Sequence, residues 1–254
     1  MRHSFRYSLL ITWLILLAAC NSHPVKSGFE TENISVSEDA AAPDSSIIKL
    51  YQPYKEILDK DMNRVISVSG FQMEKDKPES LLTNFLADML LEEATIVAKE
   101  KELDIVPDVS YFNYGGIRTS LPKGDITVGK IFELMPFENQ LVFVKLSGEK
   151  MKAFLDYVAD HGGDSVGGAR LVISNEKATK ISIGGEAFDP SKQYWLVTND
   201  YTAGGGDGLS MLQNSLSYVD SGEKIRDVII AYMERKQDQG EMITAKLDGR
   251  ISNE

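Results

Sequence analysis

The chain has 254 residues, of which 43% are hydrophobic, enough to bury the core of one large domain or of two small ones packed closely together. Its formal net charge at pH 7 is -11, from 27 Lys and Arg against 38 Asp and Glu. Because nucleic acid is bound by a broad basic face, this charge argues against nucleic acid as a partner, although a local arginine remains able to bind one small anion.

The amino-terminal residues have the pattern of an exported protein. Arg2 and Arg6 precede an apolar run over residues 9–17, which is too short to span a membrane comfortably. The letters "LAAC" that follow resemble a bacterial lipobox, which implies cleavage before Cys20 and acylation of that residue. We therefore expect a signal peptide over residues 1–19 and a lipid-anchored protein, with the outer membrane or the periplasmic face favoured. An ordinary signal peptide with a coincidental cysteine is the alternative.

Residues 20–46 follow as a segment rich in Ser, Glu, Asp and Ala, including "SVSEDAAAPDSS". Such a composition buries little apolar surface, and it predicts a flexible acidic tether. Cys20 is the only cysteine of the chain, so the mature protein has no internal disulfide. The folded domain is expected over residues 47–254.

Strands and helices alternate along this folded part. Residues 65–71, 140–146 and 194–200 are β-branched with a period of two, which predicts strands. Three apolar stripes with helical spacing predict helices, the second of them capped by Ser147. The stripes are Leu82, Phe85, Leu86, Met89, Leu90 and Val97; Met151, Phe154, Leu155 and Val158; and Ile225, Val228, Ile229, Tyr232 and Met233. The pairs Gly162-Gly163, Gly167-Gly168 and Gly184-Gly185 mark turns. A mixed α/β domain is the prediction.

Histidine is scarce in the folded part, where His161 is the only one. A dinuclear hydrolytic centre needs several His and Asp ligands, and a Ser-His-Asp triad needs an oriented His. The sequence "YVADHGGD" indicates that His161 ends a helix, where an imidazole meets the helix dipole favourably. A catalytic or ligand role for His161 is the less favoured alternative. We therefore assign no catalytic residue, no metal ligand and no cofactor to this chain.

The loop "NYGGIR", residues 113–118, is the first candidate for ligand binding. Gly115 and Gly116 are expected to adopt positive φ and to let the backbone approach a ligand. Arg118 offers a planar guanidinium to a phosphate or carboxylate, and Asn113 offers a donor and an acceptor to a nucleobase edge. The alternative is a glycine turn with a surface arginine.

Two further segments complete the candidate site. In the glycine-rich "TAGGGDGL", Gly206 frees the backbone, and Asp207 either accepts from a ribose hydroxyl or holds the turn. In "PFEN", Pro136 fixes the backbone so that Phe137 projects for base stacking, with Asn139 beside it. Taken singly, Phe137 is more often a core residue.

In this order, "NYGGIR", "KGDIT", "PFENQLV" and "TNDYTAGGGDG" closely resemble the C-terminal substrate-binding domain of the 5'-nucleotidase and UDP-sugar hydrolase family. The resemblance implies a four-layer α-β-β-α sandwich, with the metals and the catalytic His in a separate metallophosphoesterase domain. It also implies that Asn113 and Arg118 contact the base and the phosphate or ribose, and that Phe137 stacks on the base.

Two positions depart from the family pattern. Leu209 stands where members often have a second aromatic residue, and Pro78 where they often have an arginine, which leaves Lys77 as the nearest cation. The favoured interpretation is the nucleotide-binding half of a 5'-nucleotidase-type phosphohydrolase, working with a separately encoded metallophosphatase that supplies divalent metals. The alternatives are a solitary nucleotide-binding lipoprotein and an interaction module that has lost its ligand.

Overall fold

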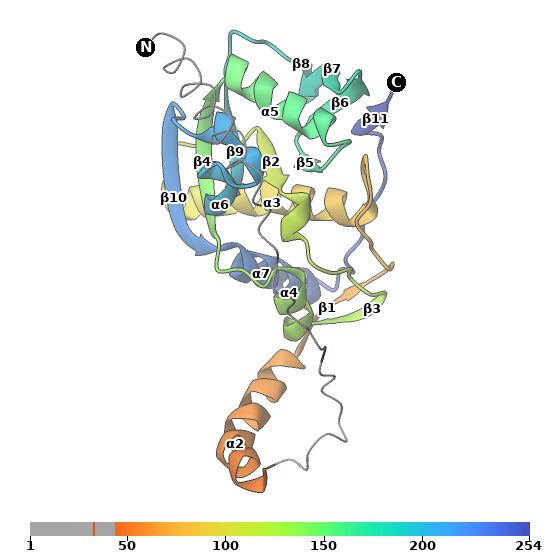
Figure 1. The fold of residues 1–254 in the computed structure, drawn as a ribbon, viewed down its shortest axis with the longest axis vertical. Coiled ribbons are helices and arrows are strands. Elements are labelled where there is room, and N and C mark those ends of the chain that lie inside the picture. Colours follow the sequence, from red (N-terminus) through yellow and green to blue (C-terminus); the bar gives the residue numbers. More distant parts are fainter. Residues whose placement is uncertain (1–32, 34–43) are drawn as a thin grey trace, which may run out of the picture. The chain divides into compact units, whose positions relative to one another are not determined.

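The computed structural model describes residue 33 and residues 44–254 (Figure 1). The predicted signal peptide, Cys20 and most of the predicted tether lie outside the described residues. The chain divides into two units, Met1–Leu50 and Tyr51–Glu254. Helix α2 (Ser45–Met62) begins two residues before the expected start of the folded domain. None of the described helices has the length and apolar character needed to cross a membrane.

A five-stranded sheet lies at the centre of the second unit. Its strands, in spatial order, are β10 (Ser217–Lys224), β4 (Gln140–Ser147), β9 (Gln193–Asn199), β2 (Val109–Phe112) and β5 (Ser165–Gly167). Strands β2 and β9 run parallel, whereas the other neighbouring pairs are antiparallel. Strands β4 and β9 confirm two of the predicted strands, and the third forms β1.

Two smaller sheets complete the strands of this unit. Strand β1 (Val65–Ser69) pairs with β3 (Gly124–Thr127). The four-stranded sheet has the order β11 (Ile251–Asn253), β6 (Ala169–Ser174), β7 (Lys177–Ile183) and β8 (Glu186–Ala187). Gly184 and Gly185 join β7 to β8 with φ of 59° and 84°, a conformation that glycine adopts without steric cost.

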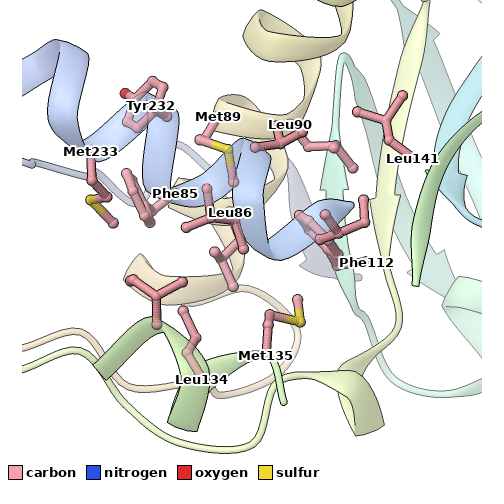
Figure 2. Packing of buried hydrophobic residues seen from close by; sticks show 14 of the residues in the cluster. Phe85, Leu86, Met89, Leu90, Phe112, Leu134, Met135, Leu141, Tyr232 and Met233 are labelled. Atoms are coloured by element: carbon pink, nitrogen blue, oxygen red, sulfur yellow. The ribbon is translucent and has the colours of Figure 1, made fainter. Parts of the chain in front are cut away.

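One face of the five-stranded sheet is covered by α3 (Leu81–Glu100) and α7 (Ile225–Asp238), with the short α4 (Val128–Leu134) beside them. Their apolar stripes and Phe112 from the sheet form the first core, seen from close by in Figure 2. Within it, the rings of Phe85 and Tyr232 meet edge to face, with centroids 5.9 Å apart. Helix α3 begins with the capping box of Ser80 and Thr83.

Helix α5 (Gly148–Asp160) belongs to the second core, on the other face of the sheet. As predicted, the Ser147 side chain caps its first turn, accepting from the backbone N–H of Lys150. The α5 stripe packs against β4 of the central sheet and against β6 and β7 of the four-stranded sheet (Figure 1). The mixed α/β class is confirmed, as are the three helices of the sequence analysis.

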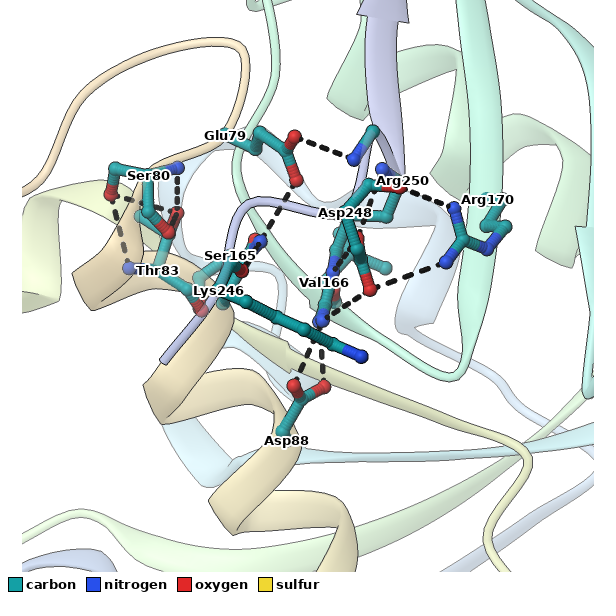
Figure 3. Close-up of polar contacts among 12 residues, drawn as sticks. Glu79, Ser80, Thr83, Asp88, Ser165, Val166, Arg170, Lys246, Asp248 and Arg250 are labelled. Carbon is teal, nitrogen blue, oxygen red and sulfur yellow. Dashed lines mark hydrogen bonds and ion pairs between the residues drawn. The ribbon is translucent and has the colours of Figure 1, made fainter. Parts of the chain in front are cut away.

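The carboxy-terminal segment ties several of these elements together. The backbone of Ile243 pairs with Val68 and Gly70, at 2.8 and 3.0 Å, and β11 pairs parallel to β6. Between these contacts, the guanidinium of Arg250 donates to both carboxylate oxygens of Asp88 on α3, at 2.6 and 2.8 Å (Figure 3). This segment therefore links β1, α3 and the four-stranded sheet.

Candidate functional site

The topology of the central sheet brings the three candidate segments together. Strands β2 and β9 are parallel neighbours, so the loops that follow Phe112 and Asn199 leave the sheet on the same side. This side, formed by the carboxyl ends of the two strands, is here called the edge of the sheet. Strand β4 runs antiparallel to β9, with Leu141 opposite Asn199, so the "PFEN" segment enters the sheet at that edge too. Ligand sites of α/β proteins form at the carboxyl ends of parallel strands, and this edge is of that kind.

A cavity of about 420 Å³ opens at this edge. Its lining residues are Asn113, Gly115, Gly116, Arg118, Phe137, Asn139, Tyr201 and Asp207. All of these except Tyr201 are site residues expected from the sequence. The geometry thus gathers seven of the nine expected residues around one space, all but Gly206 and Leu209, while their roles in binding stay predictions.

Asn113 lies deeper than the sequence analysis expected. Its side chain is 7% exposed, and its Nδ2 donates to the Asp207 carboxylate at 2.7 Å. Its Oδ1 accepts from Asn199 Nδ2 at 3.2 Å. The amide of Asn113 therefore links the two glycine-rich loops to each other. The acceptor that was expected to meet a nucleobase edge already has a partner inside the protein.

The glycines of these loops make room for the protein's own side chains. The positive φ predicted for Gly115 and Gly116 is wrong, because these residues form a 3-10 turn outside the left-handed region. A Cβ on Gly116 would lie 2.7 Å from Asn113 Oδ1, and one on Gly206 would lie 2.5 Å from the Tyr201 ring. Both distances are shorter than van der Waals contact allows, so the positions of Asn113 and Tyr201 require these glycines.

The second aromatic residue of the site is Tyr201, which the sequence analysis missed. It lies on the short helix α6 (Asp200–Ala203), directly after β9, and is 48% exposed. Phe137, the expected aromatic residue, is 41% exposed. Leu209, which was expected in place of an aromatic residue, is instead fully buried in the second core and does not line the cavity. The signal for Tyr201 was its place in "TNDYTAGGGDG", two residues after a strand that ends at this edge.

Arg226 on α7 anchors the loop that carries Phe137. Its side chain is almost fully buried; it donates to the backbone oxygen of Phe137 at 3.3 Å and to the carboxylate of Glu138. The guanidinium also lies 4.0 Å from the centre of the Phe132 ring. Hydrogen bonds from Lys224 and from Arg226 lower the pKa of Glu138 to about 2, so the Glu138 carboxylate that Arg226 contacts stays charged at neutral pH. No sequence motif pointed to Arg226.

Three cations gather beside the "NYGGIR" loop. Arg118 is exposed and donates to the backbone oxygen of Gly115 at 3.0 Å. Lys75 donates to the backbone oxygens of Tyr114 and Ile117, at 3.0 and 2.6 Å. Burial lowers the pKa of Lys75, and the charge of Arg118 adds to the effect. Lys77, the cation expected here, lies 4.9 Å from the centre of the Tyr114 ring, while Lys75 lies at 4.3 Å. The region is locally positive in an acidic protein.

A buried carboxylate lies below the loop of Asp207. Asp164 is 5% exposed and accepts from the Tyr111 hydroxyl at 2.9 Å. Burial raises the pKa of Asp164 to about 6. The hydroxyl of Tyr157 donates to the backbone oxygen of Asp207 at 2.8 Å, and His161 stacks on the Tyr157 ring with centroids 4.0 Å apart.

His161 ends helix α5, as predicted, with its Nδ1 2.9 Å from the backbone oxygen of Tyr157. Within residues 44–254, no group of three or more His, Cys, Asp or Glu side chains is arranged to hold a metal ion.

The comparisons with known proteins agree with this architecture. The family model of the 5'-nucleotidase C-terminal domain matches residues 48–214, and the chain belongs to this family. A protein named UshA from Yersinia enterocolitica is 30% identical over 217 residues, which are 83% of this chain and 38% of that protein. A 5'-nucleotidase from Vibrio parahaemolyticus is 26% identical, over 78% of this chain and 35% of its own length.

Among solved structures, the 5'-nucleotidase precursor from Thermus thermophilus superposes with a TM-score of 0.67 and 26% identity. The match covers 84% of this chain and 44% of that protein. The chain thus spans less than half of the length of each of these relatives.

Proposed function

We propose that this chain binds the nucleoside end of a nucleotide and is the substrate-binding half of a 5'-nucleotidase-type phosphohydrolase. The observation that carries the proposal is the single cavity shared by Phe137, Tyr201, Asn139, Asp207 and Arg118. It places aromatic rings, an amide, a carboxylate and a guanidinium around one space. The rings and the amide suit a base, the carboxylate suits the hydroxyls of a ribose, and the guanidinium suits a phosphate.

The side chains of this cavity have exposed surface or hydrogen-bonding capacity left for a ligand. Base stacking on an aromatic side chain contributes about 1 to 3 kcal/mol, and both rings are partly exposed on the cavity. The side-chain amide of Asn139 lines the cavity, where it offers a donor and an acceptor to a base edge. Arg118 uses one N–H for Gly115, which leaves the rest of its fork for an anion.

Hydrolysis in this proposal depends on a partner. A separately encoded metallophosphatase would supply the divalent metals and the attacking water, while this chain holds the nucleoside so that the phosphorus lies near that water. The proposal includes export and a lipid anchor at Cys20 on the periplasmic side. Cys20→Ser would then release the protein from the membrane fraction, and continued membrane association would contradict the anchor.

A thermal-shift screen tests the binding part. Adenosine, AMP and a panel of other nucleosides, nucleotides and nucleotide sugars are added to the wild-type protein, to Phe137→Ala and to Arg118→Ala. We expect stabilisation of the wild type, its loss in Phe137→Ala, and its loss in Arg118→Ala with AMP more strongly than with adenosine. Phe71→Ala and Arg170→Ala serve as controls, because both residues are exposed and lie outside the cavity. An unchanged melting curve across the whole panel would contradict nucleotide binding.

Hydrolysis of AMP in the presence of Mn²⁺ tests the dependence on a partner. We expect no turnover by the purified chain alone and turnover after addition of a metallophosphatase that lacks a substrate-binding domain of its own. Metal-dependent turnover by the chain alone, lost in Phe137→Ala, would contradict the division of labour and would leave the binding proposal standing.

A further inference from the structure

The carboxylate of Asp207 is held on both of its oxygens by side chains of the protein. Its Oδ1 accepts from the Tyr201 hydroxyl at 2.8 Å, and its Oδ2 accepts from Asn113 Nδ2 at 2.7 Å. The backbone N–H of Asp207 donates in return to the Tyr201 oxygen at 3.3 Å. Asp207 itself is exposed and lines the cavity. Its carboxylate is therefore fixed in direction while remaining open to a ligand.

We propose that the Tyr201 hydroxyl is a positioning group, which sets the Asp207 carboxylate to receive the vicinal diol of a ribose and so favours ribonucleosides over their 2'- and 3'-deoxy analogues. This inference rests on the proposed nucleoside binding, and it assigns a separate task to one oxygen atom of this chain. The aromatic ring of Tyr201 is not part of this task, since a phenylalanine ring would offer the same surface to a base.

The local backbone leaves Tyr201 little freedom. Its ring lies against Gly206, where a Cβ would come within 2.5 Å of ring atoms. Gly205 and Asp207 on either side have φ of 92° and 54°, and Gln213 Nε2 donates to the Gly204 backbone oxygen at 2.6 Å. Left-handed backbone of this kind forms a tight turn that Gly and Asp tolerate well. The hydroxyl therefore meets the carboxylate because the loop holds both in place.

The hydrogen-bond acceptor sites that remain on the Asp207 carboxylate match the two donors of a diol. An ionised carboxylate accepts about four hydrogen bonds, two on each oxygen. One site on each oxygen is taken by Tyr201 and Asn113, and the other site on each oxygen is left for two neighbouring hydroxyl donors. Hydrogen bonds from a hydroxyl to a charged oxygen are short and strong. Because the carboxylate is already oriented, a diol binds without first ordering the Asp207 side chain.

The hydroxyl keeps its proton under the conditions of such binding. The hydrogen bond to Asp207 raises the pKa of Tyr201 above its usual value, and the nearby charge of that carboxylate acts in the same direction. The O–H donor therefore persists across the neutral range.

Calorimetric titration with adenosine, 2'-deoxyadenosine and 3'-deoxyadenosine tests the inference on the full-length protein. We expect the wild type to bind adenosine at least about tenfold more tightly than either deoxy analogue, which is the worth of one charge-assisted hydrogen bond. In Tyr201→Phe, this preference should fall about threefold or more, while the affinity for the deoxy analogues stays within about twofold. Tyr218→Phe is the matched control, because Tyr218 is exposed on β10 and lies outside the cavity.

A double-mutant cycle decides whether the hydroxyl acts through Asp207. Asp207→Asn removes the charge and keeps a residue that tolerates φ of 54°. In that background, Tyr201→Phe should cause no further loss of ribose preference, because the two residues act as one unit. Additive losses would overturn the inference.

An unchanged ribose preference in Tyr201→Phe would overturn the inference too, as would a wild type that prefers the deoxy analogues, and nucleoside binding itself would then stand. A wild type that binds none of the three nucleosides would remove both proposals together.

Discussion

Arg250 and Arg118 both lie beside polar loops, but their guanidinium groups differ in how many of their donors bond within the protein. Arg250 is 5% exposed and donates to Asp88, Asp248 and the backbone oxygen of Val166, the last at 3.3 Å (Figure 3). Arg118 is exposed on the cavity, and within residues 44–254 its side chain makes one hydrogen bond, to Gly115. The first holds the chain together, whereas the second has donors left for a ligand.

The contrast shows what separates a structural cation from a binding cation in this fold. Burial lowers the pKa of Arg250, but hydrogen bonds from the guanidinium to Asp88 and Asp248 outweigh it and raise that pKa above its usual value. Burying a guanidinium is costly unless its charge is paired and most of its donors are hydrogen-bonded. An exposed guanidinium has no such requirement, because water can accept from its donors, and these donors also remain available to a ligand.

Arg250→Ala should have the largest effect on folding. It removes a buried cation that joins the carboxy-terminal segment to α3, and we expect the free energy of unfolding to fall by about 3 kcal/mol. The loss stays near the low end for a buried pair because Asp88 is half exposed and is rehydrated. Urea denaturation measures it. Arg170→Ala is the control, since Arg170 is half exposed in its pair with Asp248 and should cost at most about 1 kcal/mol. Equal losses in the two variants would contradict the structural role of Arg250.

Asp164 offers the case of a buried charge whose hydrogen bonds come from neutral donors. Its carboxylate accepts from the Tyr111 hydroxyl and from the backbone N–H of Ser165, at 2.9 and 2.8 Å. Its pKa is raised by burial from 3.8 to about 6, so the folded state favours the protonated form. The contribution of Asp164 to the free energy of unfolding is therefore largest below pH 4, where the carboxyl is protonated. It falls as the pH rises to about 6 and stays low above that.

Asp164→Asn removes this penalty while keeping the shape of the side chain. We expect the variant to be more stable than the wild type by about 2 kcal/mol at pH 8, with the difference vanishing near pH 4. Urea denaturation at the two pH values measures the change. A difference that is independent of pH would show that Asp164 does not titrate in this range.

Arg226 shares a feature with each of the two arginines. It is buried like Arg250, and like Arg118 it belongs to the candidate site, because it bonds to the loop of Phe137. Arg226→Met should keep the volume and lose the hydrogen bonds to Phe137 and Glu138, at a cost of about 1 to 2 kcal/mol. The same change should weaken nucleoside binding, because the loop of Phe137 loses its anchor. Stability and thermal-shift measurements on one sample check both effects. Loss of stability with unchanged nucleoside binding would place Arg226 with Arg250 as a purely structural residue.

The sequence predicted the helices and strands that are marked by a local pattern of residues. Helix α5 follows from its apolar stripe and from Ser147, and α3 and α7 follow from stripes of the same kind. The short strands β5, β8 and β11 gave no such signal, because two or three residues do not establish a period. They depend on pairing with partners far away in the chain.

The site was predictable in its membership and less so in its internal contacts. Phe137, Asn139, Asp207 and Arg118 share a cavity because their segments all leave or enter one edge of the sheet. The prediction for Leu209 was wrong because the family pattern has its second aromatic residue after the glycines, whereas Tyr201 comes before them. Arg226 was out of reach, since nothing near it in sequence marks a residue that supports a loop about ninety positions away.

Arg118→Ala should have the smallest effect on folding and a clear effect on binding. The side chain is exposed and gives up one hydrogen bond to Gly115, so the free energy of unfolding should change by no more than about 0.5 kcal/mol. Nucleotides should lose more affinity than the corresponding nucleosides, because the guanidinium is expected to meet the phosphate. Arg118→Lys should recover only part of this loss, since an ammonium group cannot reproduce a two-pronged contact. Urea denaturation beside titration with AMP and adenosine separates the two effects. A variant that is destabilised like Arg250→Ala would place Arg118 among the structural cations. A variant that binds AMP as the wild type does would contradict the binding role of Arg118.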